Sequence, residues 1–403
     1  MKKKILMMAA GFSIAVVLSE IILRLLGISY PNFFIPDPIV GISHCPGVEG
    51  RYEMEGKSYV TINSDGLRDI EHAKEKPPGT IRIAVLGDSF AEALQVELED
   101  TFWAIMEREL RKLLGREVNS VEAINFGTSA HGTAQELLTL RHRVWDYSPD
   151  MVLLAFSTAN DIADNSCVLK QREYIPYFIY QGDSLVLDRS FLRSRPYRFR
   201  QNMAGKLYYG LANRSRIMQL INILRFRFKR AGRKNGEDNF LEQGLYEEVY
   251  LPPRDEIWKN AWRVTEGLIL KMKEEVEARG ADFFLVLLSS AMQTHPDPSL
   301  RRSFRKKIGS PDLFYPNRRL RAFAEKNGIH VLSLAEDFQK YAEKEEVYLH
   351  GFGSRLGRGH WNETAHRLAG KKLAAWLHSC FEEMKLQISE SESEWEEKFE
   401  VGN

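Results

Sequence analysis

The stretch IAVLGDSFAEAL, residues 83–94, decides how this chain is organised. Its small and branched apolar residues stop at Gly87, and Asp88 and Ser89 follow directly before a helical pattern. An apolar run of this length that ends at a glycine is typical of a buried parallel strand that gives way to a helix. Two interpretations of Ser89 are open: a nucleophile held at the strand end, or a turn residue that caps the next helix.

The same alternation of strand and helix continues through the chain. Helical patterns occupy residues 101–114 and 256–279. Strands rich in apolar residues are expected at 81–86, 121–126, 151–156, 283–288 and 330–334. Continuous apolar strands suit a sheet that is covered by helices on both faces. The pattern therefore predicts an α/β/α sandwich built on a parallel sheet.

Composition excludes some classes of protein. The chain has 403 residues, 44% of them hydrophobic, so one large domain with insertions is as plausible as two domains. The formal net charge of +1 gives no overall electrostatic reason to expect nucleic-acid binding. The three cysteines, Cys45, Cys167 and Cys380, can form at most one disulfide and are too scattered for a zinc cluster.

The N-terminal segment, residues 1–27, predicts membrane targeting. Lys2, Lys3 and Lys4 precede a run of apolar and small residues that continues to Leu26 with few interruptions. The positive flank predicts a cytoplasmic N-terminus with the rest of the protein on the other side, which is the periplasm or cell surface in a bacterium. Residues 17–19, VLS, make a mediocre cleavage site, so a retained signal anchor is favoured over a cleaved signal peptide.

Three further regions flank or interrupt the regular pattern. Residues 28–79 form an N-terminal arm with a turn signal at 62–69 (INSDGLRD), and residues 80–383 form the main domain. An insertion at about 166–253 contains an expected hairpin at 177–188 and the basic, amphipathic stretch 214–234. That stretch is either a solvated helix packed on the domain or a surface for anionic lipid or glycan. The acidic residues 384–403 are expected to be a disordered tail.

Polar residues that suit a serine nucleophile follow several of the expected strands. Gly127 ends the second strand, Asn160 and Asp161 follow the third, and His360 lies in a glycine-rich loop before the last helix. Carboxyl ends of parallel strands converge on one crevice, so these groups are expected to meet Ser89. His360 would be the base, although a surface loop histidine is the plain alternative, while His366 belongs to the helix itself.

The backbone N–H groups of Ser89 and Gly127 and the side-chain amide of Asn160 could form an oxyanion hole, which acyl transfer at a serine requires. Glycine suits such a position because its backbone can approach a substrate closely. No metal and no cofactor is expected in this chemistry.

In chain order, the serine of GDSF (Ser89), the glycine of NFG (Gly127), the asparagine of AND (Asn160) and the histidine of GHWN (His360) resemble the four signature residues of the SGNH (GDSL-like) hydrolase family. The resemblance spans residues 80–381 and implies a flavodoxin-like three-layer fold with a five-stranded parallel sheet and ester chemistry at serine. It extends to membrane-anchored esterase-like members that share the NSDGLRD arm.

One position departs from the family pattern. The family usually places an aspartate three residues before the histidine, where this chain has Gly357, and no carboxylate lies between Glu346 and His360. Either another acid orients His360, with Asp337 the leading candidate and Asp161 the second, or a main-chain carbonyl does so in a Ser–His dyad. We favour the dyad.

The sequence therefore predicts a serine esterase that cleaves O-acyl, acetyl-like esters of an extracytoplasmic glycan or lipid through an acyl-enzyme at Ser89. Two alternatives remain: an O-acyltransferase for a cell-surface polysaccharide, which would use the same groups, and a glycan-binding protein that has lost turnover, supported only by Gly357. The expected partners are this substrate and the membrane, without nucleic acid.

Overall fold

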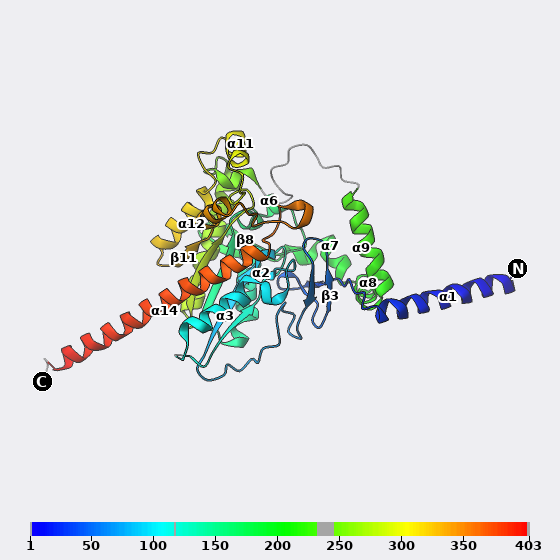
Figure 1. Cartoon of the computed structure of the whole chain (residues 1–403), viewed down its shortest axis with the longest axis horizontal. Coiled ribbons are helices and arrows are strands. Elements are labelled where there is room, and N and C mark those ends of the chain that lie inside the picture. Colours follow the sequence, from blue (N-terminus) through cyan, green and yellow to red (C-terminus); the bar gives the residue numbers. More distant parts are fainter. Residues whose placement is uncertain (1, 117, 232–245, 401–403) are drawn as a thin grey trace.

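A five-stranded parallel sheet forms the centre of the molecule. The computed structural model describes residues 2–116, 118–231 and 246–400. In spatial order the strands are β11 (His330–Ser333), β10 (Asp282–Leu288), β7 (Met151–Ser157), β5 (Thr80–Gly87) and β6 (Ser120–Asn125). Every neighbouring pair is parallel. The expected fold class, a three-layer sandwich on a five-stranded parallel sheet, is confirmed (Figure 1).

Helices cover both faces of this sheet, as its apolar strands require. All seven residues of β7 are buried. One face packs against α4 (Thr133–His142), α10 (Glu256–Glu277) and α12 (Tyr315–Lys326). The other packs against α3 (Phe102–Leu114), α13 (Ala335–Lys344) and α14 (Glu363–Glu400). Four further helices follow the strands: α2 (Ser89–Glu92), α5 (Asp161–Asp164), α6 (Cys167–Lys170) and α11 (Pro298–Ile308).

The N-terminal arm consists of two small antiparallel hairpins. Strands β1 (Phe34–Asp37) and β2 (Gly41–His44) form the first hairpin, and β3 (Glu49–Tyr52) and β4 (Ser58–Thr61) form the second. In the turn that follows, the Asn63 side chain accepts hydrogen bonds from the backbone N–H groups of Asp65 and Leu67. Asp69 then accepts from the backbone N–H of Asn125 at 2.8 Å, which fastens the arm to the edge strand β6.

The insertion contains the expected hairpin and a group of three helices. Strands β8 (Tyr177–Gln181) and β9 (Ser184–Asp188) pair antiparallel. They are followed by α7 (Arg195–Gln201), α8 (Met203–Arg214) and α9 (Arg216–Ala231). The basic stretch thus forms α9, and its last residues, 232–234, lie outside the described residues.

An N-terminal helix, α1 (Lys2–Leu25), projects from one end of the molecule beside α8 and α9, and α14 extends from the opposite end (Figure 1). Helix α1 is long and apolar enough to cross a membrane, and none of its residues is buried. All three cysteines are free thiols.

The expectation of a disordered acidic tail differs from the structure. Residues 384–400 continue α14 without a break. No glycine or proline interrupts the chain from 371 to 401, and Glu, Lys and Leu favour helix, so propensity opposes the charge argument.

Candidate active site

Ser89 begins α2 at the carboxyl end of β5, but it is Asp88 that caps the helix. The Asp88 carboxylate accepts a hydrogen bond from the backbone N–H of Phe90 at 2.9 Å. Gly87 makes the sharp turn possible, because a Cβ there would lie 2.8 Å from the Cβ of Ala91 and 2.9 Å from the carbonyl oxygen of Ala155. The Ser89 hydroxyl, which capping does not use, is left for another partner.

That partner is His360. The Ser89 Oγ and His360 Nε2 atoms are 2.8 Å apart, and His360 lies in the loop before α14, as the sequence predicts. The His360 ring packs on Phe90, with 5.0 Å between the ring centroids. A serine hydroxyl within hydrogen-bond distance of an imidazole is the arrangement that general-base activation requires.

The carboxylate beside His360 comes from the N-terminal arm. Glu55 Oε2 lies 2.6 Å from His360 Nδ1, and Glu55 Oε1 accepts the backbone N–H of His360 at 2.9 Å. Both side chains are mostly buried, with 26% of His360 and 16% of Glu55 exposed. This contact assigns the proton of the neutral imidazole to Nδ1 and leaves Nε2 to accept from Ser89.

The expected dyad and both candidate acids were therefore wrong. Asp337 forms an ion pair with Lys372, at 2.8 Å, on the surface of the main domain. Asp161 accepts the backbone N–H of Ser157 at 2.7 Å. The physical reason is the shape of the His360 loop, because Gly359 has a φ of 84° and any Cβ there would overlap the Glu55 carboxylate. The loop therefore leaves room for the arm.

Glu55 carries no signal that sequence reasoning could use. It sits in the turn between β3 and β4, 305 residues before His360. Its neighbour Gly56 has a φ of 69° and packs so closely on the Gln95 carbonyl that a Cβ would overlap it. Gly56 indicates a turn in the sequence. The position that Glu55 takes in the folded protein, however, depends on how the hairpin packs against segments far away in the chain.

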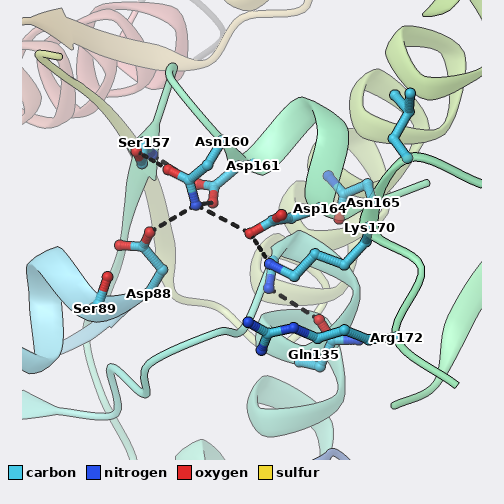
Figure 2. Close-up of polar contacts among 12 residues, drawn as sticks. Asp88, Ser89, Gln135, Ser157, Asn160, Asp161, Asp164, Asn165, Lys170 and Arg172 are labelled. Atoms are coloured by element: carbon cyan, nitrogen blue, oxygen red, sulfur yellow. Dashed lines mark hydrogen bonds and ion pairs between the residues drawn. The ribbon is translucent and has the colours of Figure 1, made fainter. Parts of the chain in front are cut away.

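The proposed oxyanion-hole residues gather around α2. A Cβ on Gly127 would lie 2.6 Å from the Cβ of Ala91, so only glycine allows this approach. The backbone N–H of Gly127 donates to Asn125 Oδ1 at 2.9 Å. The Asn160 amide nitrogen lies 3.0 Å from Asp88 Oδ2, 3.2 Å from Asp161 Oδ1 and 3.1 Å from Asp164 Oδ2 (Figure 2). Both donors thus have internal acceptors, which a substrate oxyanion would have to replace.

Burial controls the charge of the carboxyl groups around Asn160. It raises the pKa of Asp88 and of Asp161, and it raises the pKa of the nearby Glu136 as well. Asp164 instead pairs with Lys170 (Figure 2). Raised pKa values favour neutral carboxyl groups, which lessens the negative charge close to a developing oxyanion. Among the described residues no group of His, Cys, Asp and Glu is arranged to hold a metal ion.

Two other histidines, His350 and His366, are buried beneath the site. Burial lowers the pKa of His350 to about 4, and its Nδ1 lies 2.7 Å from the Gly359 carbonyl, next to His360. Burial lowers the pKa of His366 to about 3, and its Nδ1 accepts the backbone N–H of Phe102 at 3.2 Å. His366 lies within α14, as expected.

Comparison with known proteins gives matches among solved structures alone. No protein-family model and no curated protein matches the chain. A G-D-S-L family lipolytic protein from Desulfitobacterium hafniense is 12% identical, with a TM-score of 0.35 over 73% of this chain and 98% of that one. A catalytic mutant of an acetylxylan esterase from Geobacillus stearothermophilus is 12% identical, with a TM-score of 0.36 over 73% and 95%. A Bacteroides fragilis protein described as an acylhydrolase is 14% identical, with a TM-score of 0.30 over 74% and 87%.

Proposed function

We propose that the protein is a serine esterase whose catalytic triad is Ser89, His360 and Glu55. The observation that carries this proposal is the continuous chain of contacts from Ser89 Oγ to His360 Nε2, at 2.8 Å, and from His360 Nδ1 to Glu55 Oε2, at 2.6 Å. Nucleophile, base and orienting acid are the three parts that define this chemistry on unrelated folds.

The reaction follows from these contacts. Ser89 Oγ attacks the ester carbonyl while His360 Nε2 takes the hydroxyl proton, and the resulting imidazolium is stabilised by the Glu55 carboxylate. The backbone N–H of Ser89, at the start of α2, donates to the oxyanion, and Gly127 and Asn160 supply further donors once they release their internal acceptors. His360 then protonates the departing alcohol, which leaves an acyl group on Ser89. Water, deprotonated by His360, cleaves that acyl-enzyme and restores the serine.

The substrate class and location belong to the same proposal. In this proposal helix α1 retains the protein at a membrane, and the three lysines in its first turn favour a catalytic domain outside the cytoplasm. The substrates are then O-acyl esters of a glycan or lipid on that side. Gly357 was the only support for a protein without turnover, and Glu55 provides the carboxylate that Gly357 lacks.

Labelling and turnover test the proposal together. A fluorophosphonate probe is expected to label the wild-type protein at Ser89 and to leave the Ser89→Ala variant unlabelled. The folded wild-type protein should hydrolyse p-nitrophenyl acetate, and adding sugar acceptors should not divert the acyl group. Failure of both labelling and hydrolysis would exclude an esterase, whereas acylated sugar as the main product would identify a transferase.

A further inference from the structure

A cavity of about 660 Å³ lies between the N-terminal arm and helices α7, α8 and α9. This volume is within the range of about 300–1,000 Å³ that ligand sites occupy. Much of its wall is aromatic, formed by Phe33, Phe34, Tyr52, Tyr208, Tyr209 and Phe226. None of the residues that line this arm–helix cavity belongs to the triad. An apolar aromatic wall favours a ligand with a sizeable apolar part.

The same cavity carries excess positive charge. Four arginines line it: Arg51, Arg172, Arg200 and Arg225. In the described part of the chain none of the four forms an ion pair, and Arg200 lies over the Tyr174 ring. The one carboxylate among the lining residues, Glu53, is paired with Arg227 at 2.6 Å. Guanidinium groups without carboxylate partners suit a phosphate or carboxylate on the ligand.

The helices that line one side of the cavity are hydrogen-bonded to the C-terminal part of α1. The Glu20 carboxylate of α1 accepts from the backbone N–H of Arg216, at 2.9 Å, and from the Ser215 hydroxyl, at 3.1 Å. Farther along, the backbone N–H of Tyr30 donates to Gln219 at 2.9 Å. These contacts hold α8 and α9 against the base of α1, as Figure 1 shows. A membrane that contains α1 therefore lies close to the cavity.

Helix α8 presents an apolar stripe at this end of the molecule. Met203, Leu207 and Leu211, spaced four residues apart, are 84%, 62% and 50% exposed. Across residues 189–231 the sequence has twelve Lys and Arg and no Asp or Glu. Exposed apolar residues combined with this charge are typical of helices that lie in the headgroup region of an anionic membrane.

Another part of the cavity wall comes from sequence neighbours of the catalytic residues. Met54, which lines it, is the residue before Glu55, and Ser129, which also lines it, follows Gly127 by two positions. The cavity thus lies between helices that pack on the base of α1 and the segments that hold the catalytic groups.

We infer that the arm–helix cavity binds an anionic membrane lipid, with an acyl chain against the aromatic wall and the charged headgroup on its arginines. The location of the lipid rests on the proposed anchoring by α1. The binding itself does not depend on ester chemistry at Ser89, so the two can be tested apart.

Calorimetric titration of the full-length Ser89→Ala protein in phosphatidylcholine nanodiscs tests this inference. The probe is dihexanoyl phosphatidic acid, with empty nanodiscs as the blank. Saturable binding is expected, whereas inorganic phosphate and dihexanoyl phosphatidylcholine should each bind about tenfold more weakly or less, because each lacks one half of the recognised chemistry.

Charge variants locate the site. Arg200→Gln and Arg225→Gln should each weaken binding about tenfold, the cost of losing a hydrogen bond to a charged group. Arg198→Gln is the matched control, because Arg198 is an exposed residue of α7 that does not line the cavity. This variant loses the same charge and should keep the wild-type affinity. Ala212→Trp, which fills the cavity from a buried lining position, should abolish binding; if it does not fold, the arginine variants still decide.

Three results would overturn the inference: no saturable binding above the blank, equal affinity for inorganic phosphate, or equal losses in Arg198→Gln and the two lining variants. Fluorophosphonate labelling of the wild-type protein is measured in parallel. Lipid binding without either labelling or ester hydrolysis would exclude the esterase and keep the lipid site, and labelling without lipid binding would keep the esterase and exclude the lipid site.

Discussion

Ser89 and Glu55 reach the same histidine from very different surroundings. Ser89 follows β5, whose last six residues are all buried in the central sheet. Glu55 lies in a turn between two four-residue strands that pair only with each other. The nucleophile is therefore positioned by the core of the protein, and the acid by a docked hairpin. Mutations in the core should therefore displace Ser89, whereas mutations in the hairpin should displace Glu55.

Several contacts align the N-terminal arm on the loop that follows α2. Ser58 donates to the Leu94 carbonyl, and Arg68 donates to the Val96 carbonyl at 2.6 Å. Gly56 rests on Gln95 in the same loop after α2. All three contacts are to the segment that follows the nucleophile helix, so the arm is aligned on the element that carries Ser89.

The largest effect is expected from the core side of the triad. Ser89→Ala and His360→Ala should each lower kcat for p-nitrophenyl acetate by about 10⁶-fold, because the bond-forming group or its base is lost. Circular dichroism should be unchanged in both. A folded variant that keeps a tenth of wild-type activity would remove that residue from the mechanism.

Loss of the acid on the arm should cost less. Glu55→Gln is expected to lower kcat by about 10⁴-fold, because the amide cannot stabilise the imidazolium or fix its tautomer as a carboxylate does. Asp337→Asn serves as the control, since Asp337 pairs with Lys372 on the surface, and its kcat should stay within about twofold of wild type.

Restoring the usual family spacing should not rescue the Glu55→Gln variant. Gly357 has a φ of 79°, and a Cβ there would lie 2.9 Å from the His295 ring, so an aspartate is strained and crowded. We expect the double variant Glu55→Gln, Gly357→Asp to be no more active than Glu55→Gln. A gain of tenfold or more would show that the loop can supply an acid to His360.

A substitution in the β3–β4 turn should disturb Glu55 without removing any catalytic group. Gly56→Ala forces an L residue to a φ of 69° and against the Gln95 carbonyl. Strain of this kind costs about 1–3 kcal/mol, and the hairpin should undock before the sheet unfolds. Esterase activity should fall while fluorophosphonate labelling of Ser89 slows in proportion. Equal activity with a lowered melting temperature would mean that the turn is structural only.

The smallest effect concerns the buried carboxyl groups near Ser89. Burial raises the pKa of Asp161, so its contribution to stability is fully present below the unfolded-state pKa and is lost as the pH rises through the folded-state value. Asp161→Asn cannot ionise. Its melting temperature relative to wild type should therefore be higher at about pH 8 than at about pH 5. An unchanged difference at the two pH values would show that Asp161 is ionised throughout.

The central sheet and most of the residues at the carboxyl ends of its strands could be predicted from the sequence. Apolar runs of strand length mark the strands, and the four short motifs follow in a fixed order along the chain. Ser89 and His360 were found in this way, and the structure brings them together. Glu55 could not be found, since its role depends on where a short hairpin docks, which no local pattern encodes. The continuation of α14 to Glu400 was not predicted, although the signal is local. The acidic charge of residues 384–400 indicates disorder, whereas the helix propensity of the same residues favours a helix.

The separation of 305 residues between Glu55 and His360 has a consequence for biosynthesis. A chain leaves the ribosome from its N-terminus, at about 5–20 residues per second. The acid and the nucleophile are thus made early, and the base is made near the end. During most of translation the serine has no histidine to activate it, so a growing or truncated chain cannot attack the esters around it, and reactivity begins only when nearly the whole polypeptide has been made.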